Sequence, residues 1–113
     1  MKKSDKNFEF PLQQPKGIYE FFNHYAEIKA AAYDRGDMDA LSMLIDFNQA
    51  LRHVKFTARQ EEAIYFVFIL GLSQQEAGSE MGVTQQAVQR FLFLATSKLA
   101  DHYKHRRNES ESH

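Results

Sequence analysis

Apolar residues in the first half of the chain recur at intervals of three and four, and no stretch of useful length alternates with a period of two. A first stripe runs from Pro15, a favoured first-turn residue, to just before Gly36. A second stripe begins after Asp37, a favoured N-cap, and reaches about Arg52. The pattern predicts two amphipathic helices. Their apolar positions are Ile18, Phe21, Phe22, Tyr25, Ile28 and Ala32, then Leu41, Leu44, Ile45 and Leu51.

A third helix is predicted over residues 58–70, opened by Thr57 and Gln60 at the spacing of a capping box. Apolar residues occupy nearly every face of its second half, so we expect this helix to be buried on more than one side. Gly71 ends it. With two more helices after this glycine, the chain predicts an all-α fold of about five helices.

The last two helices have the pattern of a helix-turn-helix. Ser73 and Glu76 form a second capping box that opens a short helix, and Thr84 caps a fifth helix that runs to about residue 105. Gly78 is the small residue expected where the two helices cross, and Gly82 is the turn residue that tolerates a positive φ. The apolar residues expected to pin the two helices together are Ala77, Met81, Val83, Val88 and Phe91.

These patterns divide the chain into four segments. Residues 1–14 mix polar side chains with Phe8 and Phe10 and show no period, which predicts an extended arm. The two N-terminal helices form an element used for packing or dimerisation, the helix-turn-helix forms the second unit, and a polar stretch ends the chain as a disordered tail. The expected boundaries are 1–14, 15–55, 56–105 and 106–113.

The segment from Thr57 to Leu99 resembles region four of bacterial sigma factors and its relatives among phage regulators and small helix-turn-helix proteins. The residues that carry the resemblance are FTARQEEAIYFVFILGLSQQEAG, then GVTQQAV, then Ala95 and Lys98. The resemblance implies that the helix beginning at Thr84 enters the DNA major groove. It also implies that the N-caps lie near phosphates. The DNA-binding residues expected on this basis are Ser73, Gln74, Thr84, Gln85, Gln86, Gln89, Arg90 and Lys98.

A full sigma factor also carries a region that binds the core polymerase and melts the promoter. The residues before Thr57 are too few and of the wrong pattern for that region, so we do not expect this chain alone to open promoters. RNA polymerase is nevertheless a candidate partner through the surface that region four uses.

The charge pattern limits how tightly the chain can hold DNA. The formal net charge is -1, and residues 57–82 carry one basic and four acidic side chains. Residues 84–107 carry five basic side chains and one acidic one, so we expect the last helix to supply the phosphate contacts. The bases would be read by glutamines and Arg90, which can bond adenine and guanine bidentately. The alternative is that the glutamines are only good helix formers and that this helix is an ordinary solvated face.

Two apolar residues of the last helix do not fit its core-facing stripe. At about 100° per residue, Phe93 and Leu94 point away from the stripe that would pack inside the domain. They need a partner, either this chain's own N-terminal helices or a second copy. We favour a homodimer, because the chain has more apolar stripe than one small core consumes, and a dimer would present two reading helices to a pseudo-palindromic site. The predicted interface residues are Phe93, Leu94, Phe21, Phe22 and Tyr25.

No nucleophile–base pair, phosphate loop or carboxylate dyad is present, and His102 and His105 lack a third metal ligand at a useful spacing. We therefore expect no enzyme and no cofactor. The sequence has no cysteine and no apolar run that could cross a membrane, which favours a soluble, cytoplasmic protein.

The function that we predict is a bacterial or phage transcription regulator that binds double-stranded DNA sequence-specifically. Two alternatives stay open. One is a phage DNA-packaging component such as a small terminase subunit, which would form a ring rather than a dimer. The other is a protein-interaction module that keeps the helix-turn-helix fold and uses its apolar last helix to bind, and for instance inhibit, a partner such as RNA polymerase.

Overall fold

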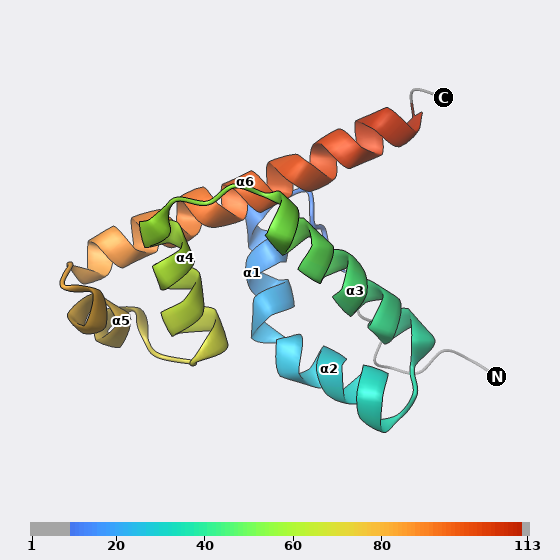
Figure 1. Ribbon diagram of the computed structural model, residues 1–113, viewed down its shortest axis with the longest axis horizontal. Helices are drawn as coiled ribbons and strands as arrows, with labels where there is room; N and C mark the ends of the chain where they lie inside the picture. Colours follow the sequence, from blue (N-terminus) through green and yellow to red (C-terminus); the bar gives the residue numbers. More distant parts are fainter. Residues whose placement is uncertain (1–9, 112–113) are drawn as a thin grey trace.

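The computed structural model describes residues 10–111, with side chains described through residue 106, and this part of the chain is helical with no strand. The predicted all-α fold is confirmed. The last helix runs along the length of the molecule, and the other helices line up beneath it (Figure 1). The elements are α1 (Pro15–Asn23), α2 (Tyr25–Asp34), α3 (Met38–His53), α4 (Ala58–Ile64), the π-helix η1 (Tyr65–Ile69), α5 (Gln74–Met81) and α6 (Gln85–Glu111).

The first predicted helix is in fact two, separated at His24. The backbone of His24 leaves the helical region, with φ -105° and ψ 12°. Its N–H bonds the carbonyls of Glu20 and Phe21 at 3.1 and 3.2 Å, and its Nδ1 lies 2.9 Å from the Glu20 carbonyl oxygen. These contacts satisfy the last carbonyls of α1. The break lets α1 pack against α6 while α2 packs against α3, which one straight helix would not allow.

The predicted N-caps are confirmed, and each satisfies amides at the start of its helix. The Asp37 carboxylate accepts from the amides of Asp39 and Ala40. Thr57 and Ser73 each form the full reciprocal capping box. The Thr84 hydroxyl accepts from the Ala87 amide at 3.0 Å.

The third predicted helix is not α-helical throughout, because after Ile64 the α-helix α4 continues as the π-helix η1. The amide of Leu70 donates to the carbonyl of Tyr65 at 2.9 Å, five residues back, and the segment ends at Gly71 with φ +78°. The expectation of burial on more than one side is wrong, because no residue of η1 is buried. One side of this segment packs against the core, and the other side leaves Tyr65, Ile69 and Leu70 about half exposed.

The aromatic residues of α1 lie in the core of the chain itself. Phe21 stacks on Phe47 of α3 with ring centroids 4.1 Å apart, and Phe22 stacks on Phe68 of η1 at the same separation. Phe21 is fully buried and Phe22 nearly so, while Tyr25 is half-buried against Phe21. Phe21 and Phe22 are therefore core residues and not the exposed interface residues that were expected. The N-terminal stripe packs against α3, η1 and α6, and the two predicted units share one core.

The ends of the described chain differ from their predicted form. Phe10, in the expected arm, packs edge-on against Phe21 with centroids 5.6 Å apart, whereas Phe8 lies outside the described residues. Helix α6 continues to Glu111, past the predicted end near residue 105 and into the predicted tail. Within the described residues, none of the helices combines the length and hydropathy that crossing a membrane would require.

Candidate nucleic-acid interface

The crossing of α5 and α6 depends on two glycines with different roles. A Cβ at Gly78 would lie 2.8 Å from the Val83 carbonyl oxygen, so only glycine lets the turn approach α5 this closely. Gly82 has open space around it but a φ of +72°, the left-handed conformation that other residues adopt at a cost. The Val83 amide closes the turn by donating to the Gly78 carbonyl at 2.9 Å. The predicted helix-turn-helix is therefore present in the fold.

Apolar residues from both helices hold this geometry. Ala77 and Met81 of α5 are buried, and Val83 and Phe91 are half-buried against the same core. The stripe expected to face inward from α6 does so. Its members, all fully buried, are Val88, Leu92, Ala95 and Leu99.

The first turns of α6 expose the residues expected to read bases. Thr84, Gln85, Gln86, Gln89 and Arg90 are all exposed. Residues 86, 89 and 90 lie about 100–200° around the helix from Val88, on the face opposite the core. This end of α6 lies at one extremity of the molecule beside α5 (Figure 1), so the face is open to a large ligand.

The N-terminus of α5 is less suited to a phosphate than expected. Ser73 is exposed and Gln74 half-buried, but the Glu76 carboxylate accepts from the Ser73 amide at 2.9 Å. This carboxylate occupies the amide end of the helix with a negative charge. A phosphate approaching Ser73 would meet it.

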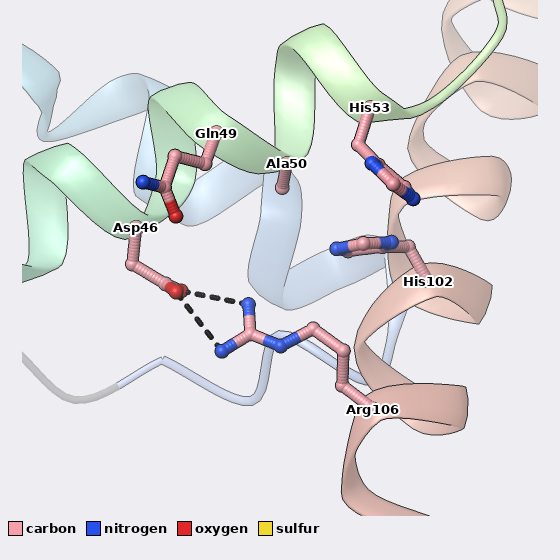
Figure 2. A pocket seen from close by; sticks show the side chains of 6 residues that line it. All are labelled: Asp46, Gln49, Ala50, His53, His102 and Arg106. Carbon is pink, nitrogen blue, oxygen red and sulfur yellow. Dashed lines mark hydrogen bonds and ion pairs between the residues drawn. The ribbon is translucent and has the colours of Figure 1, made fainter. Parts of the chain in front are cut away.

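Two basic residues of α6 are engaged within the chain. Lys98 Nζ donates to the Lys55 carbonyl and to Gln60 Oε1, both at 2.9 Å. Arg106 forms a two-point ion pair with Asp46 of α3, at 2.9 and 3.1 Å (Figure 2). Lys98, which was expected to contact phosphate, thus also has a structural role, since two of the three N–H donors of its ammonium group bind acceptors within the chain.

Residues 24–105 match the family model described as ECF sigma factor, over more than half of the chain. The chain belongs to the ECF sigma factor family. The match extends beyond the segment 57–99 that carries the sequence resemblance and takes in α2 and α3 as well. No curated protein and no solved structure gave a significant match. The family is one of non-enzymatic regulators that act with DNA and RNA polymerase.

In this ECF sigma family member, Arg90 and Lys104 are the lysine and arginine residues of α6 that show neither an ion pair nor a side-chain hydrogen bond among the described side chains. The side chain of Arg107 lies outside that set. The basic surface of the last helix is thus smaller than its composition predicts, because neighbouring helices use part of it.

Besides the Lys98 contacts, three contacts of this family member were missed by the sequence reasoning. Arg59 of α4 donates to the Met81 carbonyl at 2.9 Å, at the end of α5, and also pairs with Glu62. The spacing of Arg59 and Glu62 was a visible signal for their pair. The bonds from Arg59 to Met81 and from Arg106 to Asp46 join residues far apart in sequence, so no local sequence pattern predicts them.

A cleft between α3 and α6 lies outside the reading surface. It is lined by Asp46, Gln49, Ala50, His53, His102 and Arg106, and Figure 2 shows His53 and His102 facing each other. Their ring centroids are 5.4 Å apart. Among the described residues no group of three or more histidine, cysteine, aspartate or glutamate side chains that could hold a metal ion is found.

Proposed function

We propose that this protein is a sequence-specific transcription regulator that binds double-stranded DNA by placing the first turns of α6 in the major groove. The observation that carries the proposal is the joint exposure of Gln86, Gln89 and Arg90 on one face of a helix whose opposite face is fixed in the core. Glutamine can bond the N6 and N7 edge of adenine, and arginine the O6 and N7 edge of guanine. Each such pair discriminates against the wrong base by about 1–3 kcal/mol.

The small number of available cations predicts that phosphate contacts contribute little. Each phosphate neutralised by a protein cation adds about 0.9 to the slope of log affinity against log salt. With Arg90 and Lys104 as the described candidates, and Lys98 and Arg106 engaged elsewhere, we expect a shallow slope and weak binding by a single copy. A second contact is then needed for tight binding, and RNA polymerase or a second copy of the chain would supply it.

The homodimer stays a prediction. Its first argument, the surplus of apolar stripe in α1, is weakened by the burial of Phe21 and Phe22 within the chain. The need of Phe93 and Leu94 for a partner remains, because Phe93 is 55% and Leu94 37% exposed. The mass of the protein in solution distinguishes a monomer or dimer from the ring expected of a DNA-packaging component.

A protein-interaction role is the second candidate function. It is favoured by the three half-exposed apolar side chains at η1 and the turn after it, Tyr65, Ile69 and Leu70. Apolar surface of this kind is typical of sites that bind other proteins. In this alternative the helix-turn-helix is a scaffold, and the chain acts by binding a partner such as RNA polymerase.

One experiment tests the proposed function. The purified full chain is incubated with a pool of random duplex DNA at low and at moderate salt, and the retained molecules are sequenced. We expect a short enriched motif that survives moderate salt; two-fold symmetry in that motif would indicate a dimer. Absence of retained DNA at low salt would overturn the proposal and favour the protein-interaction role.

A further inference from the structure

Phe93 lies on the face of α6 that carries the proposed reading residues. It follows Gln86 by seven residues, which is about two turns, and at about 100° per residue the two side chains point within about 20° of the same direction. It is also four residues after Gln89 and three after Arg90, the spacings at which helical side chains are neighbours. The apolar ring therefore continues the line of polar reading side chains.

The ring is also available to a ligand. Phe93 is 55% exposed, in contrast to Leu92, which is fully buried beside it. The Thr96 hydroxyl donates to the Phe93 carbonyl at 3.0 Å, a contact that involves the backbone and not the ring. The residues one turn away on either side, Gln89, Arg90 and Ser97, are polar.

We infer that Phe93 contacts the C5-methyl group of a thymine in the recognised site. The thymine methyl is the one apolar group that a base pair presents in the major groove, and phenylalanine is among the side chains that contact it. The distance along α6 from Gln86 to Phe93 is about 10 Å at 1.5 Å per residue, comparable with the groove width of about 12 Å. A side chain at that distance is still within the groove that Gln86 enters.

The size of the apolar feature favours DNA over a protein at this place. Phe93 and Leu94 are the two large exposed apolar residues of α6 among its described side chains, and they point about 100° apart. A stable protein interface buries about 800 Å² on each partner, far more than two separated side chains supply. One methyl group needs only one ring. This inference rests on the proposed function, since it assigns a base to the same reading face.

The test replaces each thymine of the enriched motif, one at a time, by deoxyuridine, which removes the methyl group and keeps the base pairing. For the full chain we expect about a fourfold loss of affinity at one position, the effect of one methyl-sized apolar contact. Phe93→Ala should show a similar loss on the unmodified site and no further loss on the deoxyuridine site, as expected for two groups that act through one contact. Leu94→Ala is the matched control and should keep the full methyl dependence.

The outcomes separate this inference from the proposed function. Specific binding that is insensitive to every deoxyuridine, a motif without thymine, or unchanged methyl dependence in Phe93→Ala overturns the thymine contact and leaves DNA recognition standing. Failure to enrich any motif overturns both. A thermal melt of Phe93→Ala that matches the parent chain excludes misfolding as the cause of a loss.

Discussion

Lys98 of α6 donates a hydrogen bond to the Oε1 atom of Gln60 in α4, at 2.9 Å, across 38 residues of sequence. The same Oε1 accepts from the Thr57 amide at 3.0 Å, so one buried glutamine both caps α4 and holds α6. A second bond from Lys98 reaches the Lys55 carbonyl. A lysine whose place in the sequence favours a phosphate contact is thereby used to join the start of the helix-turn-helix domain to its last helix.

Lys98→Met should lower the free energy of unfolding by about 1–2 kcal/mol. The change removes a charged donor and leaves the Gln60 oxygen with one donor fewer, and hydrogen bonds to charged groups contribute in this range. Unfolding in urea measures the effect. Lys104→Met is the matched control, since Lys104 is exposed, and should stay within about 0.5 kcal/mol. Equal stability of the two variants would show that the Lys98 contacts contribute nothing.

Gly78→Ala should destabilise the fold by about 1–3 kcal/mol and should also weaken DNA binding. The added Cβ would lie 2.8 Å from the Val83 carbonyl oxygen, so the crossing of α5 and α6 must open. Gly82→Ala meets no atom within 4 Å and should cost only the left-handed backbone, about 1–2 kcal/mol. Urea unfolding and operator affinity are measured on both. If Gly82→Ala impairs DNA binding as much as Gly78→Ala, the close approach at Gly78 is not what sets the reading helix.

Gln86→Ala and Arg90→Ala should each weaken binding to the selected site by about 5- to 150-fold, the range of one bidentate base contact. Both side chains are exposed, so the thermal melts should stay unchanged. Titration of labelled duplexes gives the affinities. Lys104→Ala serves as the phosphate control: its loss should be similar on specific and random DNA. Full affinity in both Gln86→Ala and Arg90→Ala would remove the reading role of α6.

Stability should fall as the pH rises above about 10, and Tyr103→Phe should remove part of that fall. Burial, with a smaller contribution from the charge of Asp46, raises the pKa of Tyr103 above its ordinary value of 10.0. Above pH 10 the unfolded chain therefore loses this proton before the folded chain does, which favours unfolding. Urea midpoints between pH 8 and about 11 test the difference.

At neutral pH the same substitution should cost little. The Tyr103 hydroxyl is buried and has no hydrogen-bond partner among the described residues, so its removal breaks no such bond. The ring, over which the Arg106 guanidinium lies 5.2 Å from the centroid, is retained in phenylalanine. A parallel alkaline fall in both proteins would show that other groups cause it.

Phe21→Ala should cost about 3–5 kcal/mol, whereas Phe93→Arg should change the free energy of unfolding by less than about 0.5 kcal/mol. Phe21 is fully buried against Phe47, and Phe93 is 55% exposed. Thermal melts and light scattering report stability and mass together. A lower mass for Phe93→Arg would support the predicted dimer, and a large loss of stability in that variant would contradict the exposed placement of its ring.

Local signals determined much of this fold from the sequence alone. The N-caps at Asp37, Thr57, Ser73 and Thr84 depend on side chains that bond amides two or three residues ahead, so they could be read from spacing. The inward stripe of α6 follows from helical periodicity, and the roles of the two turn glycines follow from the sterics of a tight crossing. The break at His24 and the π-helical turn at Tyr65 were missed, because each depends on what the flanking residues pack against in the folded chain.

What only the tertiary structure decided is which side chains are left for a ligand. The sequence shows that Phe21 and Phe22 are apolar and need to be buried. Whether they are buried in the core or at an interface is decided by the positions of Phe47 and Phe68, on which they stack. The sequence shows that the last helix carries several basic residues. Only the packing of α3 and α4 against α6 determines that Arg106 and Lys98 bind groups within the chain. Helical periodicity involves residues only a few positions apart, so it can be recognised in the sequence. The contact partner of a side chain depends on segments that folding brings together from distant parts of the chain.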